Sequence, residues 1–335
     1  MPPCIFCLEE KPILTHEHVF PAALGGALVL KNSTCAECNH SCSKFEQPLA
    51  TELAPFRLFF QIPNRRGDFP QVAATLKTQD KEYEGRVKGD GSIEVKRVVI
   101  EVTGKDGRRE FLHQFLTARQ KEKLQQEARE KRLEIIESGP GDPVEAEIHV
   151  GGDLELIGSS EGFRSTSKIA YVGLARYAGA TFAMGDSFNE VRAYIRDGTG
   201  KPSSRLFVHE RFLQSVQQGP HQHSIIIAAK HDKGTVDAIV RLFGGLCYFI
   251  RLSEHYAGAD FFNTLVYDAH RGEINGTLQS RVDAEILQTE DVATSGETVW
   301  DDLPASGQRF CSFMESAIRS KIGRARAESK NGLSL

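Results

Sequence analysis

The chain has 335 residues, of which 40% are hydrophobic and 26% charged, and its formal net charge is −4. This composition is that of an ordinary globular protein, and the length predicts two or three domains. The acidic balance excludes a chain that binds nucleic acid through its overall charge, so a nucleic-acid partner would need a local basic surface.

No apolar run approaches the roughly 18 residues that span a bilayer, and the first residues lack a signal-peptide pattern, so we predict a cytoplasmic protein. Five of the seven cysteines lie within the first 42 residues, mostly in paired spacing. In a reducing compartment this pattern favours a metal site over disulfides. The other thiols, Cys42, Cys247 and Cys311, are interpreted as packed side chains rather than ligands.

Residues 1–66 are predicted to form a small module that ends in a stretch containing proline and glycine. The module contains two Cys-x-x-Cys pairs, Cys4/Cys7 and Cys35/Cys38, separated by 27 residues. Each pair can place two sulfurs about 2.3 Å from one Zn²⁺, and two pairs complete the closed tetrahedron of a structural site. Because so short a module has a small core, zinc would supply folding energy. Unrelated buried thiols and a redox pair are the alternatives.

Between the two pairs lies Thr-His-Glu-His, followed by Val-Phe-Pro and a Gly-Gly turn. We predict a short strand that carries Glu17 and His18, and a helix that begins at the second cysteine pair and carries Asn39. The zinc would hold this strand against the helix. Glu17 and Asn39 offer oxygen atoms that suit Mg²⁺ or Mn²⁺. A neutral His18 can deprotonate a water for attack on phosphorus.

The order of these motifs resembles that of the HNH endonucleases, which have the ββα-metal fold. The resemblance covers residues 4–55 and looks most like the zinc-stapled branch that includes phage Holliday-junction resolvases of the endonuclease VII type. Glu-His-Val-Phe-Pro also resembles a signature of bacterial HNH proteins. The resemblance implies that His18 is the general base, that Glu17 and Asn39 bind the catalytic cation, and that the four cysteines bind zinc.

The chain departs from the pattern of this family at the end of the motif. Many members have a second His or Asn one helical turn after the first, where this chain has Ser43, so phosphate oxygens and water would complete the metal shell. His16 and His40 are spare candidates for a metal ligand. The simpler interpretation of His16 is an exposed or supporting side chain, and that of His40 is a residue on the helix surface. In an ideal strand Glu17 and His18 point to opposite faces, so they act together only if the strand is distorted or ends there.

Residues 67–138 alternate apolar and polar positions around Gly-Asp-Gly and Lys-Asp-Gly turns, which predicts β-hairpins. A helix is predicted over 116–137, where charged pairs at i,i+4 spacing follow one another. Residues 108–132 carry eight Lys or Arg and four Glu, whereas residues 1–66 carry six of each kind. Any basic nucleic-acid surface would therefore come from outside the first module, although a solvated surface is the simpler interpretation.

Residues 67–335 give no motif that can be assigned to a catalytic function. The remaining elements are predicted in residues 139–335. The predicted elements are a helix over 165–184 capped by Ser165, a helix over 187–198, a strand meander over 204–280, loops over 281–308 and a helix over 310–330. Residues 319–330 carry five Lys or Arg and one Glu. Four scattered histidines lack metal-ligand spacing and are interpreted as loop and surface residues: His221, His223, His231 and His255.

We therefore predict an α+β protein in which a small zinc-stabilised ββα-metal module precedes a larger region with antiparallel strands. The predicted function is metal-dependent hydrolysis of phosphodiester bonds in DNA, with residues 139–335 serving target recognition or regulation by analogy. Cleavage of both strands would need a homodimer or sequential nicks. The alternatives are a non-catalytic zinc module that binds nucleic acid or protein, and cleavage of RNA by the same site.

Overall fold

A computed structural model describes most of the chain. The described residues are 1–64, 66–77, 82–90, 92–96, 98–103, 109–114, 118–131, 147–149, 158–200, 204–207, 221–271 and 273–275. They contain helices and antiparallel sheets, which confirms the predicted α+β class. The chain divides into two compact units, residues 1–70 with 152–335 and residues 71–151. The first unit thus combines the N-terminal segment with the C-terminal segment. The predicted division into residues 1–66, 67–138 and 139–335 stays a prediction.

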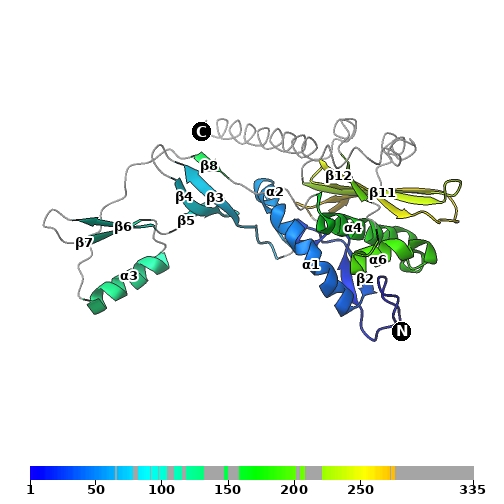
Figure 1. Ribbon diagram of the computed structural model, residues 1–335, viewed down its shortest axis with the longest axis horizontal. Helices are drawn as coiled ribbons and strands as arrows, with labels where there is room; N and C mark the ends of the chain where they lie inside the picture. Colours follow the sequence, from blue (N-terminus) through cyan, green and yellow to red (C-terminus); the bar gives the residue numbers. More distant parts are fainter. Residues whose placement is uncertain are drawn as a thin grey trace, which may run out of the picture. The chain divides into compact units, whose positions relative to one another are not determined.

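The first unit contains a six-stranded antiparallel sheet in the order β14-β13-β10-β11-β12-β9. Figure 1 labels β11 and β12 of this sheet. Three strands follow one another as a meander, but β13 returns to pair with β10, so a simple meander describes only part of the sheet. The strands are β9 (Ser204–Phe207), β10 (Gln222–Lys230), β11 (Thr235–Leu242), β12 (Leu246–Ser253), β13 (Phe261–Asp268) and β14 (Glu273–Asn275).

Helix α4 (Ser160–Ala178) packs on this sheet and also contacts α1 and α6 (Figure 1). The helix begins earlier than predicted, because the side chain of Ser159 rather than Ser165 accepts the capping hydrogen bond from a backbone N–H. Almost every residue from the first turn to Ala175 is buried, as expected for a helix that is covered on all sides. A Cβ atom at Gly173 would lie 2.7 Å from Ile225, so glycine permits the close approach of α4 to β10.

The predicted helix over 165–184 is in fact two helices. Gly179 adopts a φ of +94° and separates α4 from the short α5 (Ala180–Ala183). The next predicted helix is confirmed as a 3-10 turn, η3 (Asp186–Phe188), followed by α6 (Asn189–Asp197). Helix α6 ends at Gly198, which adopts the left-handed conformation that commonly terminates helices.

The N-terminal module has the predicted order of two strands and a helix. Strands β1 (Thr15–His18) and β2 (Val29–Thr34) pair antiparallel, and the 3-10 turn η1 (Ala22–Leu24) lies between them. Helix α1 (Ala36–Glu52) follows, and α2 (Ala54–Phe59) comes directly after it. Because α1 packs against α4, the module shares one hydrophobic core with the helices and sheet of the first unit.

The loop between β1 and β2 is held by two side chains of the sheet. His223 is fully buried, against the expected surface position, and its Nε2 lies 3.1 Å from the carbonyl oxygen of Leu24. Its Nδ1 accepts a hydrogen bond from the Phe243 backbone, and burial lowers the pKa of His223 to about 4, so the ring is neutral. The hydroxyl of Tyr267 donates to the carbonyl of Gly25 and accepts from the N–H of Ala27.

Tyr171 of α4 connects the first cysteine pair to the helical layer. Its buried hydroxyl lies 2.8 Å from the carbonyl oxygen of Ile5 and 2.9 Å from that of Ala183. We expect Tyr171→Phe to lower the free energy of unfolding by about 1–3 kcal/mol, because it leaves the carbonyl oxygen of Ile5 without this donor, while that of Ala183 keeps its hydrogen bond from Arg192. Chemical denaturation would measure this change. An unfolding midpoint equal to that of wild type would show that the hydroxyl does not link these segments.

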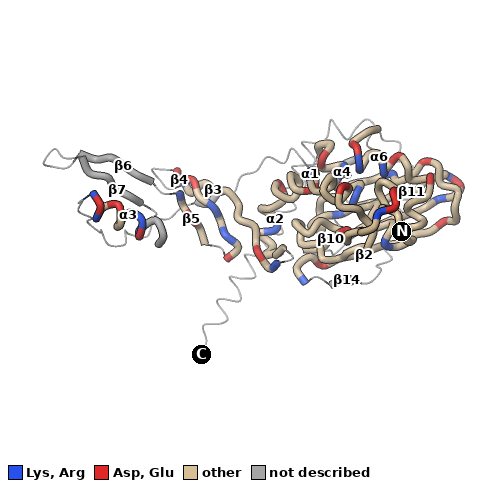
Figure 2. The backbone as a smooth tube through the Cα atoms, turned by 90° about the horizontal axis from the view of Figure 1, so that it is seen from below, with Lys and Arg blue, Asp and Glu red and all other residues tan. Residues whose placement is uncertain are grey.

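The described residues of the second unit form a four-stranded sheet in the order β5-β4-β3-β8, a separate β6-β7 hairpin and a helix. The predicted hairpins are confirmed, and Lys and Arg alternate with Glu along α3 (Figure 2). The elements are β3 (Val72–Lys77), β4 (Glu82–Val87), β5 (Ile93–Val95), β6 (Val98–Thr103), β7 (Arg109–Gln114), α3 (Ala118–Lys131) and β8 (Glu147–His149).

Several expected elements lie outside the described residues. They are the end of the helix predicted over 116–137, the loops over 281–308 and the helix over 310–330 with its basic residues 319–330. Among the described helices, none has the length and apolar character needed to cross a membrane.

Candidate active site

Four cysteine side chains form a cluster at the start of α1. The sulfurs of Cys4, Cys7, Cys35 and Cys38 all lie within 4.8 Å of one another, while Cys42 lies outside the cluster. Cys35 caps α1 by accepting a hydrogen bond from the backbone N–H of Cys38, and its own N–H donates to the sulfur of Cys4. Four convergent sulfurs are the donor set of a closed structural zinc site.

The thiols of this cluster influence one another's ionisation. A hydrogen bond from Cys38 lowers the pKa of Cys4 to about 4, and the same pairing raises the pKa of Cys38. Burial raises the pKa of Cys35 to about 11. The shifts of Cys4 and Cys38 are opposite because the thiol of Cys38 donates to the thiolate of Cys4, while burial disfavours a further thiolate at Cys35. A divalent metal would keep all four sulfurs deprotonated.

The β1-β2 pairing is irregular next to the acid-His dyad. Thr15 pairs with Thr34, but Glu17 pairs with Leu30, so β2 has extra residues opposite this point. Asn32 lies in this excess with a φ of +47°, in the left-handed region typical of bulges. The irregularity lies between Thr15 and Glu17, and the strand ends at His18, so β1 meets the expected condition that the strand be distorted or end at the dyad.

Glu17 is buried and forms an ion pair with Lys168 of α4. The side chain of Lys168 has 0% exposure, and its ammonium also lies 2.6 Å from a carboxylate oxygen of Glu46 and 3.3 Å from the carbonyl oxygen of His18. Burial lowers the pKa of Lys168, but the carboxylates of Glu46 and Glu17 raise it by more, so the ammonium stays charged at neutral pH. Two carboxylates and one ammonium leave the cluster with a formal charge of −1.

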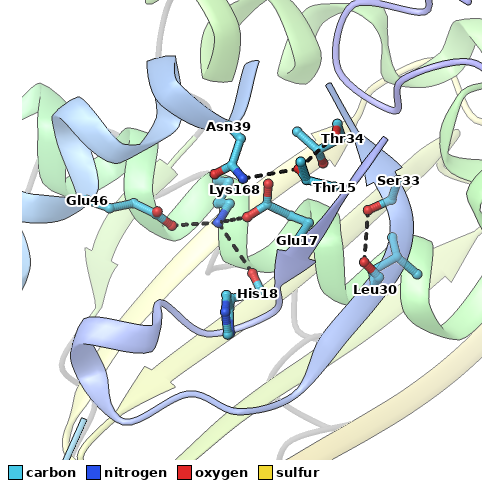
Figure 3. Close-up of polar contacts among 9 residues, drawn as sticks. All are labelled: Thr15, Glu17, His18, Leu30, Ser33, Thr34, Asn39, Glu46 and Lys168. Atoms are coloured by element: carbon cyan, nitrogen blue, oxygen red, sulfur yellow. Dashed lines mark hydrogen bonds and ion pairs between the residues drawn. The ribbon is translucent and has the colours of Figure 1, made fainter. Parts of the chain in front are cut away.

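Asn39 lies on α1 in the helix's first turns and faces the same side of β1 as Glu17 (Figure 3). Its amide nitrogen donates to the hydroxyl of Thr15 at 3.2 Å, and that hydroxyl donates to the carbonyl of Thr34 at 2.9 Å. This chain of hydrogen bonds fixes the amide, so that its carbonyl oxygen is available as a ligand. The structure therefore brings the two predicted oxygen ligands, Glu17 and Asn39, to one side of the strand.

The imidazole of His18 points away from Asn39 and from the carboxylate of Glu17 (Figure 3). Its Nδ1 is buried, although the residue as a whole is half-buried. His16 is exposed and accepts a hydrogen bond from the backbone N–H of Asn32 at 3.3 Å. His40 is also exposed, and the hydroxyl of Ser43 donates to its carbonyl oxygen. Glu17 and Asn39 thus lie on one side of β1, whereas the imidazole of His18 points in another direction (Figure 3).

Two residues of this site were absent from the sequence predictions. Glu46 lies seven residues after Asn39, a spacing that places both on one helix face, and this period could have identified it. Lys168 is a single charge within an apolar helical segment, and such a charge requires a partner when it is buried. Only the packing of α4 against α1 shows that the partners are Glu17 and Glu46.

Residues 4–53 match the HNH endonuclease family model. The matched segment contains the four-cysteine cluster, the Glu17-His18 dyad and Asn39, so residues 4–53 form an HNH-like module with a sulfur cluster that suits structural zinc. Comparisons with curated proteins and with solved structures give no match. Lys168 lies outside the matched residues, although its ammonium binds the dyad.

Proposed function

We propose that the HNH module hydrolyses phosphodiester bonds in DNA as a divalent-cation-dependent endonuclease. The match of residues 4–53 to an endonuclease family carries this proposal, because the matched segment holds each residue type that the chemistry needs. Glu17 and Asn39 would bind Mg²⁺ or Mn²⁺, and the four cysteines would bind structural zinc. When bound, the catalytic cation would stabilise the negative charge that develops on the phosphate oxygens.

The donor set at Glu17 and Asn39 fits a hard cation. One carboxylate oxygen of Glu17 binds Lys168, while the other, Oε2, is buried without a hydrogen-bond partner among the described residues. A buried carboxylate oxygen without a donor is costly, and a cation would satisfy it. The carbonyl oxygen of Asn39 is of the type that Mg²⁺ and Mn²⁺ prefer, and the formal charge of −1 at the cluster favours a cation.

His18 is proposed as the general base. Because Nδ1 is buried, we assign the role of proton acceptor from water to Nε2. In an in-line displacement the attacking and leaving oxygens lie on opposite sides of phosphorus. A base and a pair of metal ligands can therefore flank one phosphate from different directions, so the outward orientation of His18 is compatible with this role.

Cleavage of supercoiled plasmid tests the proposal, since a closed circle has no ends for an exonuclease. We expect nicking when Mg²⁺ or Mn²⁺ is present. We expect no nicking when EDTA is added to the cleavage assay of a protein prepared without EDTA. Asn39→Ala should reduce the rate at limiting Mn²⁺ by at least about tenfold, because it removes a cation ligand. Ser43→Ala, one helical turn later and exposed, is the matched control and should cut like wild type. Equal activity of Asn39→Ala and wild type would contradict the ligand assignment.

The second candidate is a non-catalytic zinc module that binds nucleic acid or protein. The buried ion pair of Glu17 with Lys168 favours this reading, because it occupies one carboxylate oxygen in a purely internal contact. A wild-type protein that shifts DNA in a gel but leaves plasmid and RNA intact with both metals would support it. Cleavage of RNA alone would instead assign the same site to RNA.

A further inference from the structure

Lys168 contacts both residues of the dyad although it lies 150 residues further along the chain than His18. An ammonium group has three N–H donors, and three acceptors surround this one: Glu17, Glu46 and the carbonyl of His18. The side chain is fully buried, so it is not placed to touch a substrate. Its position therefore indicates an action through the residues it holds.

The contact with Lys168 restricts the carboxylate of Glu17. With Oε1 bound to the ammonium, rotation of the carboxylate is limited, and Oε2 keeps a fixed direction on the side of β1 where Asn39 lies (Figure 3). A glutamate without this contact would lose rotamer freedom on binding a cation. The hydrogen bond to the carbonyl of His18 also fixes the backbone at the end of the strand, from which the imidazole projects.

We propose that Lys168 is a positioning residue of the nuclease site, which orients Glu17 for the divalent cation and holds the strand end that carries His18. This role rests on the proposed function and extends the site beyond the family segment to α4. Partners that orient metal ligands commonly account for about 10–100-fold in metal affinity. The consequence is that the HNH module works only when α4 is packed against α1.

The alternative is that Lys168 acts only through its charge, and the two roles predict opposite signs. Lys168→Met changes the formal charge of the cluster from −1 to −2, which by charge alone strengthens cation binding. Loss of orientation weakens cation binding instead. The double variant Lys168→Met with Glu46→Gln restores the formal charge of the cluster to −1. It also removes the repulsion between two buried carboxylates that would face each other without a cation. It therefore isolates orientation from charge.

The test measures Mn²⁺ binding to the full chain by electron paramagnetic resonance without DNA, and then plasmid cleavage as a function of Mn²⁺. We expect about 10–100-fold weaker Mn²⁺ binding in Lys168→Met and in the double variant, with unchanged zinc content and circular dichroism. If Lys168→Met does not fold, the double variant decides. Mn²⁺ binding as tight as wild type in the double variant, with cleavage retained, would overturn the role of Lys168 and leave the nuclease intact. A wild type that neither binds Mn²⁺ nor cuts would overturn both.

Discussion

Loss of zinc is expected to unfold the N-terminal module and to abolish cleavage. Structural zinc sites in small modules contribute an apparent binding free energy of about 10–16 kcal/mol, whereas whole domains are stable by about 5–15 kcal/mol. In this chain the four sulfurs hold the start of α1 against the turn that begins at Cys4, and α1 carries Asn39 and Glu46. Without zinc, the helix and the dyad are connected only by weaker contacts, such as the Asn39–Thr15 hydrogen bond and the ion pairs of Lys168.

Cys38→Ser and Cys42→Ser form a matched pair for this prediction. Both thiols are buried on α1 four residues apart, but only Cys38 belongs to the sulfur cluster. Cys38→Ser should lose zinc, show a lower melting temperature and fail to nick plasmid. Cys42→Ser should keep one zinc per chain and cut DNA. Zinc content by mass spectrometry and thermal unfolding give the readouts. Retention of zinc by Cys38→Ser with a wild-type melting temperature would refute a four-cysteine site.

The parts of the fold that the sequence predicts correctly are those fixed by local spacing. Two Cys-x-x-Cys pairs specify the sulfur cluster, and the order of strand, turn and helix follows from the residues between them. The start of α4 was misplaced because Ser159 and Ser165 are equally good caps by residue type. The structure instead gives Ser165 a hydrogen bond from its hydroxyl to the carbonyl of Phe45 on α1, a contact that no local pattern encodes.

The parts that sequence reasoning missed depend on contacts between distant segments. His223 is scattered in the sequence, yet it packs between Phe20 and Phe243 and holds the loop at Leu24. The extra residues in β2 also follow no sequence pattern that predicts a bulge. The left-handed conformation of Asn32 is recognised only from the pairing of β2 with β1. The network around Lys168 belongs to the same class, since its partners come from the opposite end of the unit.

His18→Ala is expected to reduce plasmid cleavage by about 10²–10⁴-fold, the usual contribution of a general base. The substitution removes the imidazole but not the backbone carbonyl that Lys168 binds, so the ion pair of Glu17 should persist. Mn²⁺ binding and zinc content should therefore stay at wild-type levels, which separates a chemical role from a structural one. The rate would be measured at saturating Mn²⁺, where weaker cation binding has no effect.

His16→Ala is the matched control for His18→Ala, two residues away on the same strand. His16 is exposed, and the contact that its ring makes with the described residues is a hydrogen bond accepted from the backbone of Asn32, so we expect cleavage close to that of wild type. The opposite result would reassign the general base. If His16→Ala were inactive and His18→Ala active, the base would be the exposed histidine. In that case the bulge in β2 would serve to present His16, since its hydrogen bond to Asn32 fixes the ring at this point.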